Sequence, residues 1–96
     1  MSKITKAAMG QECMVRIPLV CNFNTATTVH AHYRMAGMNG TGLKPPDFMG
    51  AWACSACHDE IDGRTRVLTD RQLVRLFHAE GVFRTQLQLS LMGLLK

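Results

Sequence analysis

Nine consecutive residues decide the fold of this chain, and they read Cys54-Ser55-Ala56-Cys57-His58-Asp59-Glu60-Ile61-Asp62. The first part places two thiols with a gap of two residues, which lets both sulfurs reach one tetrahedral zinc at about 2.3 Å. The second part places the imidazole of His58 four residues before the carboxylate of Asp62. On a helix these two side chains lie on one face, where they suit a divalent metal. The stretch therefore carries two kinds of metal ligand.

Two more cysteines lie upstream, at Cys13 and Cys21, and complete a set of four thiols. Their spacing is wider than that of a usual zinc knuckle, and it fits if the segment between them loops back. A single cysteine is often only a small buried apolar residue, and a Cys-x-x-Cys pair is also typical of redox sites. The redox alternative leaves Cys13 and Cys21 without a role. We predict one structural zinc with four ligands: Cys13, Cys21, Cys54 and Cys57.

The length of 96 residues predicts one domain over residues 1–96, with a thin core that a structural metal would reinforce. A hydrophobic fraction of 47% and a net charge of +4 indicate a folded protein and weakly favour an anionic partner such as DNA. No apolar run approaches the roughly 20 residues that span a bilayer, and the N-terminus does not resemble a signal peptide. We expect a cytoplasmic protein with no membrane partner, where paired cysteines are more often metal ligands than disulfides.

The pattern of the chain predicts an α+β fold, with a core over about residues 10–66 and C-terminal helices over about 69–95. In chain order we expect a short helix at residues 3–9, a strand at 12–17, a turn at 21–25 and a second strand at 27–34. These are followed by a glycine-rich loop at 37–46, a short buried extended run at 48–53 and a helix from 54 to 63 or 66. The period of two in the second strand puts its polar side chains on one face: Thr28, His30, His32 and Arg34.

Two helices are expected in the C-terminal third. The first begins near Asp70, a good N-cap residue, and Gly81 is expected to break or bend it. Its apolar stripe is predicted at Leu73, Leu76 and Phe77, with Arg71 and Arg75 facing solvent. The apolar stripe of the second is predicted at Phe83, Leu87, Leu91, Leu94 and Leu95. That stripe either packs on the core or pairs with a second copy of the chain, so a homodimer is one expected partner state.

The polar motifs also have simpler explanations. His58 and Asp62 can form an ordinary ion pair on the surface of a helix, and His30 and His32 can be polar residues on a solvated strand face. A neutral histidine is nevertheless a suitable general base near pH 7. The functional interpretation depends on the combination of all these motifs in one short chain.

That combination resembles the HNH endonucleases with a ββα-metal core, most closely the small prophage nucleases typified by YbcO. The resemblance covers about residues 10–65 and rests on four motifs: Glu12-Cys13-x-Val15-Arg16-Ile17-Pro18-x-Val20-Cys21-Asn22, Ala31-His32-x-Arg34, Gly40-Thr41-Gly42-x-Lys44-Pro45-Pro46-Asp47 and the segment 53–62. It implies a metal-dependent DNA endonuclease that hydrolyses phosphodiester bonds in phage recombination or DNA processing, with phage or host recombination proteins as partners. The alternatives are a degenerate, non-catalytic zinc-bound nucleic-acid-binding module, or an interaction protein that docks through its helical tail.

The resemblance also implies a role for individual residues. His32 matches the strand histidine that acts as general base, and His58 matches the helix histidine that binds the catalytic metal. Asp62 falls where relatives have a second helix ligand. The expected catalytic ion is a second divalent cation, Mg²⁺ first, with Mn²⁺, Ni²⁺ or Zn²⁺ as alternatives. The charges of Arg34 and Lys44 suit contacts to flanking DNA phosphates, and a surface role for each is an equal alternative.

The chain departs from the family pattern at two positions. Many relatives have a metal ligand immediately before the base, where this chain has Ala31. His30 is a candidate to replace that ligand, although it lies one residue further back. The middle asparagine of the HNH motif has no obvious counterpart, and Asp47, in the loop after Pro46, is the polar residue best placed to take over part of its role.

Overall fold

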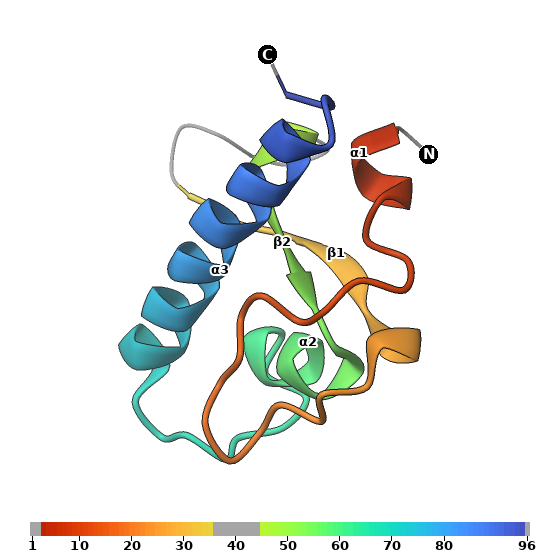
Figure 1. Ribbon diagram of the computed structural model, residues 1–96. Coiled ribbons are helices and arrows are strands. Elements are labelled where there is room, and N and C mark those ends of the chain that lie inside the picture. Colours follow the sequence, from red (N-terminus) through yellow and green to blue (C-terminus); the bar gives the residue numbers. More distant parts are fainter. Residues whose placement is uncertain (1–2, 36–44, 96) are drawn as a thin grey trace.

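The computed structural model describes residues 3–35 and 45–95, which form a small α+β fold around one short sheet (Figure 1). The helices and strands follow in this order: α1 (Lys3–Lys6), β1 (Val29–His32), β2 (Gly50–Ala53), α2 (Ser55–Ile61) and α3 (Arg71–Leu91), with two 3₁₀ turns, η1 (Thr25–Thr27) and η2 (Asp47–Met49). The predicted helix at 3–9, strand at 27–34, buried run at 48–53 and helix after Cys54 are confirmed in kind, each over a shorter range.

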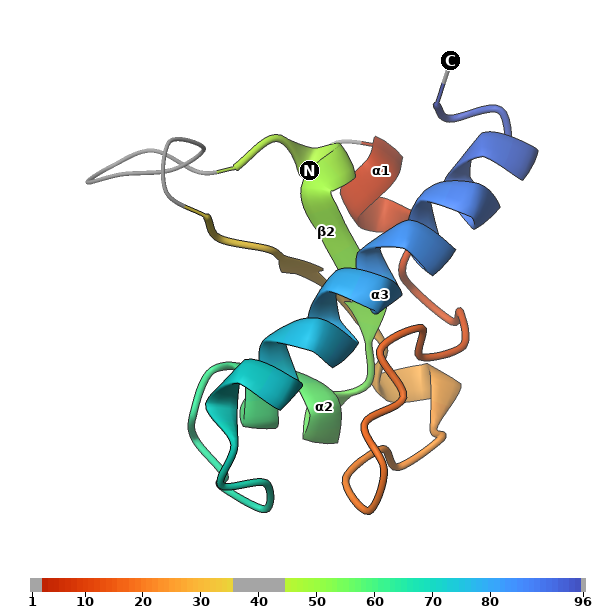
Figure 2. The ribbon, with the colours of Figure 1, turned by 90° about the vertical axis from the view of Figure 1, so that its left-hand side faces the viewer.

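The sheet has two antiparallel strands, and its register places His30 opposite Trp52 and His32 opposite Gly50. Side chains alternate between the faces of a strand. Ala31 and its neighbours on that face pack with side chains of α2 and α3, including Cys57 and Val74. The long helix α3 runs across β2, as the two perpendicular views show (Figure 1, Figure 2). The imidazoles of β1 therefore lie on the face opposite to the one that packs on α2.

The predicted strand at residues 12–17 is wrong. This segment has no regular structure, although Met14 N–H donates to the Trp52 carbonyl at 2.7 Å along the free side of β2. Arg16, Leu19 and Phe23 have φ values of 54°, 66° and 55°, the left-handed region that ordinary residues rarely adopt. The alternation of apolar residues here reflects burial in a bent loop, because the chain must turn to bring Cys13 and Cys21 together.

The helix α3 is a single helix, so the predicted break at Gly81 is wrong. A Cβ atom at position 81 would lie 2.8 Å from Val15 Cγ2 and 3.0 Å from Val15 Cα. Glycine is present here because the loop around Val15 packs directly on the helix backbone. Asp70 caps α3 as predicted, since its carboxylate accepts from the backbone N–H groups of Gln72 and Leu73.

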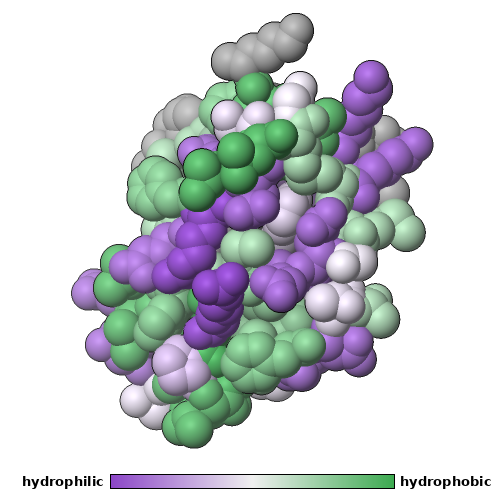
Figure 3. Space-filling model, viewed as in Figure 1, coloured by the Kyte–Doolittle hydropathy of each residue, from purple (hydrophilic) through white to green (hydrophobic). Residues whose placement is uncertain are grey.

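The predicted apolar stripes of the C-terminal third are also largely wrong. The face of α3 that packs on the core consists of Val74, His78, Gly81, Val82, Thr85 and Leu89. Phe83, Leu87 and Leu91 are instead 70%, 59% and 74% exposed. Of the predicted stripe residues, Phe77, Leu94 and Leu95 do pack against the core, the last two beside Trp52. This packing face contains glycine, histidine and threonine, so the pattern of apolar residues alone does not predict it. Apolar side chains lie at the surface over the C-terminal end of α3 (Figure 3).

None of the described helices is both long enough and apolar enough to cross a membrane.

Candidate functional site

The four cysteines converge on one point between the loop 13–21 and the start of α2. Their Sγ atoms all lie within 4.8 Å of one another, and those of Cys21 and Cys54 are 3.8 Å apart. Four thiolates around a tetrahedral zinc, with bonds of about 2.3 Å, lie about 3.8 Å from each other. Cys13, Cys54 and Cys57 are buried and Cys21 is half-buried. The predicted gathering of the four thiols is confirmed, and the cluster can hold a metal ion.

Backbone N–H groups point at the sulfurs of this cluster. Arg16 N–H donates to Cys13 Sγ at 3.4 Å, and the N–H groups of Asn22 and Cys57 donate to Cys54 Sγ at 3.5 and 3.4 Å. Such bonds stabilise negative charge on sulfur. Arg16, which donates this bond to Cys13, has a left-handed backbone, and a strained backbone persists only where its surroundings hold it. The loop is therefore shaped around the thiols.

The charge state of the cluster fits a cation. A hydrogen bond from the Cys57 thiol lowers the pKa of Cys13, and sharing that proton raises the pKa of Cys57. Burial raises the pKa of Cys21. Without an ion, Cys13 loses its proton readily, whereas Cys21 and Cys57 hold theirs more tightly. A divalent cation would displace such protons and offset part of the charge of the resulting thiolates, which is how metal binding couples to folding in small domains.

A second cluster lies at the other face of the sheet and consists of His30, His32 and Asp47. One ligand atom from each lies within 4.8 Å of the other two. His32 Nε2 is 2.9 Å from Asp47 Oδ1, at the start of η2, and the two imidazole rings meet edge to face with centroids 4.8 Å apart. The sequence placed Asp47 only in a loop near the site. Its contact with His32 could not be derived from spacing, because residues 36–44 separate the two elements.

His30 is unusual within this cluster. Neither of its ring nitrogens has a hydrogen-bond partner among the described residues, although both atoms are buried. The ring lies against Gly50, where a Cβ atom would come within 2.2 Å of His30 Nε2. Burial, followed by the neighbouring His32, lowers the pKa of His30. A neutral imidazole keeps a lone pair, so His30 is able to serve as a ligand.

His58 and Asp62 share one face of α2, as predicted, and form an ion pair with His58 Nε2 3.3 Å from Asp62 Oδ2. Arg64 Nη1 also lies 3.1 Å from Asp62 Oδ2, so the carboxylate already faces a positive charge. Within the described residues this pair does not join the cluster of His30 and His32. The structure therefore contains two separate imidazole–carboxylate groups, one on each side of the sheet.

Sequence analysis missed His78, which lies on the buried face of α3. Its Nε2 is 3.0 Å from the carbonyl oxygen of Ala31, and its ring packs edge to face on Tyr33. Burial lowers its pKa, and the charges of His58 and Asp62 are near enough to affect that pKa as well. His78 thus approaches β1 at Ala31. Its spacing from Val74 and Val82 on the helix is the only sequence signal for burial.

Glu60 lies between His58 and Asp62 in the sequence, and its side chain is fully buried. It accepts hydrogen bonds from the Thr65 hydroxyl at 2.6 Å and from two backbone N–H groups, and it pairs with Arg71 at 3.2 Å. The Thr65 bond, together with these contacts, lowers the pKa of Glu60 to about 2. Glu60 therefore stabilises the connection between α2 and α3. Arg71 was expected to face solvent, but it pairs with Glu60 instead.

The predicted DNA contacts are only partly described. Arg34 is exposed, and its backbone carbonyl accepts a hydrogen bond from Arg75 at 3.1 Å. Lys44 and most of the glycine-rich loop lie outside the described residues.

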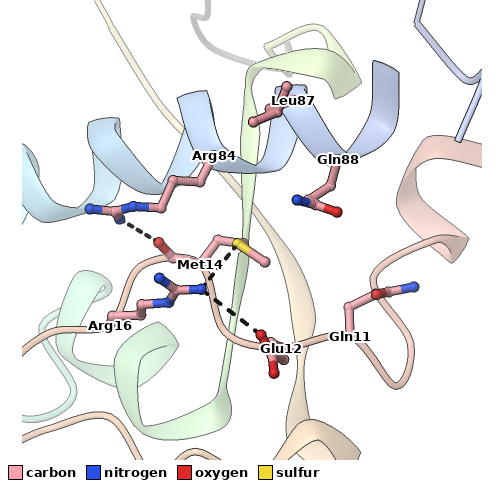
Figure 4. A pocket seen from close by; sticks show the side chains of 7 residues that line it. All are labelled: Gln11, Glu12, Met14, Arg16, Arg84, Leu87 and Gln88. Carbon is pink, nitrogen blue, oxygen red and sulfur yellow. Dashed lines mark hydrogen bonds and ion pairs between the residues drawn. The ribbon is translucent and has the colours of Figure 1, made fainter. Parts of the chain in front are cut away.

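A hollow of about 370 Å³ separates the cysteine loop from α3, lined by Gln11, Glu12, Met14, Arg16, Arg84, Leu87 and Gln88 (Figure 4). Arg84 crosses toward the loop and donates to the Met14 carbonyl at 2.7 Å. Arg16 donates to the Cys13 carbonyl at 3.0 Å and lies 3.9 Å from Glu12. Both guanidinium groups therefore have local partners: Arg84 links α3 to the loop, and Arg16 forms its contacts within the loop.

Comparison with known proteins shows the family to which the chain belongs. The family model described as "Putative nuclease YbcO" matches residues 2–94. Two curated relatives with that description, from Escherichia coli (strain K12) and Enterobacteria phage 82, are each 54% identical over 86 residues, 90% of this chain and 88% of the relative. A solved structure described as "Structure of a putative bacteriophage protein from Escherichia coli str. K-12 substr. MG1655" shares 47% identity with a TM-score of 0.80, over 94% of this chain and 99% of that one. The chain therefore belongs to the YbcO family.

Proposed function

We propose that this chain is a metal-dependent DNA endonuclease of the HNH type, active in phage recombination or DNA processing. The observation that carries the proposal is the pair of His32 and Asp47, with Nε2 and Oδ1 2.9 Å apart. In the tautomer that donates Nε2–H to the carboxylate, Nδ1 keeps its lone pair and can accept a proton from water. The names of the phage and bacterial relatives support a nuclease.

In this proposal His58 and Asp62 hold a divalent cation, Mg²⁺ before Mn²⁺, Ni²⁺ or Zn²⁺. The ion supplies positive charge for the phosphate and the leaving oxygen. The residues fit such an ion because the Asp62 carboxylate already attracts the guanidinium of Arg64. That side chain is 62% exposed and is free to move away when a cation arrives.

The four cysteines hold a structural zinc in this proposal. All four ligands come from the protein and three of them are buried, which is typical of closed structural zinc sites. The ion ties the loop 13–21 to the first turn of α2. It thereby fixes the helix that carries His58 and Asp62.

The proposed partner is DNA, whose phosphates Arg34 and Lys44 contact. Because the substrate is DNA, the proposed location is the cytoplasm. Recombination proteins of the phage or host are further proposed partners. We also propose that a second copy covers the exposed side chains of Phe83, Leu87 and Leu91. A dimer would present two cutting sites to the two strands of a duplex.

One observation favours the alternative of a degenerate nuclease that binds nucleic acid without cutting it. Ala31 stands where many HNH relatives have a metal ligand, and its side chain is buried in the core. The two functions differ in a single assay. Zinc-loaded protein incubated with supercoiled plasmid should produce nicked circles in Mg²⁺ or Mn²⁺ and none in a chelator for these ions. Binding that shifts the plasmid on a gel without nicking it in any divalent ion would favour the alternative.

A further inference from the structure

The cluster of His30, His32 and Asp47 has the ligand set of an open metal site. Two imidazoles and one carboxylate lie with one ligand atom each within 4.8 Å, from β1 and η2. Three protein ligands of this kind, with the remaining position left open, are typical of zinc and other first-row metals. The imidazoles disfavour Mg²⁺, which prefers oxygen ligands.

The buried nitrogens of His30 provide an independent reason. Buried polar atoms almost always have a hydrogen-bond partner, and an exception needs an explanation such as an ion or a water. His30 Nδ1 and Nε2 are buried and have no partner among the described residues. Gly50 leaves the space that the ring occupies, since a Cβ atom there would come within 2.2 Å of Nε2. The ring is held next to His32 and near the backbone of Asp47, and no described residue meets hydrogen-bond geometry with either ring nitrogen.

We infer that His30, His32 and Asp47 form a second site for a transition-metal ion of the Zn²⁺ or Co²⁺ type, separate from the four-thiol cluster and from the His58–Asp62 pair. One consequence rests on the proposed function. A His32 that binds the ion has no lone pair left for a water proton, so occupancy of this site inhibits cleavage.

Metal counting without DNA tests the site. Protein that keeps its thiolate-bound zinc, equilibrated with excess Co²⁺ in millimolar Mg²⁺ and then desalted, should retain one cobalt ion per chain beside that zinc, measured by elemental analysis and by native mass spectrometry. The cobalt should show only weak visible bands, because intense charge-transfer absorption would indicate cobalt at the thiolates. His30→Ala and Asp47→Asn should each retain the thiolate ion and lose the second ion.

His58→Ala and Asp59→Asn are the matched controls, and both should retain two ions. A single ion in the intact protein, or a second ion that survives His30→Ala and disappears with His58→Ala, would overturn the inferred site.

Cleavage in Mg²⁺ tests the inhibition. One equivalent of Zn²⁺ beyond the thiolate site should lower plasmid nicking at least tenfold, and a weak chelator should restore it. Unchanged or increased nicking would contradict the inhibitory role. A protein that never nicks DNA would contradict the proposed function, while the cobalt counts would still decide whether the site exists.

Discussion

The two clusters on either side of the sheet differ in how completely the protein surrounds them. The thiol cluster is mostly buried, and backbone N–H groups point at its sulfurs. The cluster of His30, His32 and Asp47 has two ring nitrogens without partners, and the Asp47 side chain is 37% exposed. Structural zinc sites are closed and catalytic sites keep an open position. We therefore propose that the four-cysteine cluster maintains the fold and that the cluster of His30, His32 and Asp47 is available for chemistry.

The largest effect is expected from removing one ligand of the four-cysteine cluster. Cys54→Ser or Cys13→Ser should leave the chain without zinc and poorly folded. Structural zinc contributes about 10–16 kcal/mol of apparent binding free energy in zinc-finger peptides, and a small domain has only about 5–15 kcal/mol of total stability. Elemental analysis and thermal melting by circular dichroism measure both effects.

His58→Ala serves as the control for the cysteine variants, because it changes a ligand outside the thiol cluster and should retain zinc. A Cys54→Ser protein that melts cooperatively at the temperature of the intact chain, without metal, would show that the cluster does not maintain the fold.

The next largest effect is expected in the rate of DNA cleavage, from a change in the cluster of His30, His32 and Asp47. His32→Ala should reduce plasmid nicking by about 10²–10⁴-fold, the usual loss for a general base. Melting temperature and zinc content should hardly change, since the polar contacts of His32 among the described residues are with Asp47 and His30. Full cleavage by His32→Ala together with no cleavage by His30→Ala would show that His30, and not His32, is the general base.

The sequence predicted those features that depend on local chemistry. The strand carrying His30 and His32, the helix after Cys54 and the cap at Asp70 all follow from short-range patterns. The gathering of four cysteines followed from the usual ligand set of zinc.

The sequence missed features that depend on distant packing. The segment 12–17 alternates like a strand, but the turns that bring Cys13 to the cluster override that pattern. Gly81 suggested a break, whereas it permits close contact with Val15. Glu60 is buried because Arg71 and the backbone after α2 surround it, and no local signal marks such a partner 11 residues away.

A smaller effect on stability should follow from a substitution that disturbs the packing of the loop 13–21 on α3. Gly81→Ala introduces a methyl group within 3.0 Å of Val15, which forces the loop or the helix to shift. Overpacking of this kind typically costs about 1–3 kcal/mol, so the melting temperature should fall by several degrees. Ser90→Ala, an exposed position on the same helix, is the control and should not lower it. An unchanged melting temperature in Gly81→Ala would show that the loop is not held tightly there.

The smallest effect on stability is expected at the exposed apolar side chains. Leu87→Glu combined with Leu91→Glu should change the melting temperature little, because both side chains are mostly exposed. Light scattering over a concentration series should find a dimer for the intact chain and a monomer for the double variant. A monomer at every concentration for the intact chain would contradict the proposed pairing.

Anomalous diffraction at the zinc absorption edge, from crystals of the protein as purified, tests most directly whether the closed cluster holds a metal. The account predicts one strong peak at about 2.3 Å from the Sγ atoms of all four cysteines. A cluster with no anomalous peak, or with its sulfurs joined as disulfides in a folded protein, would contradict it.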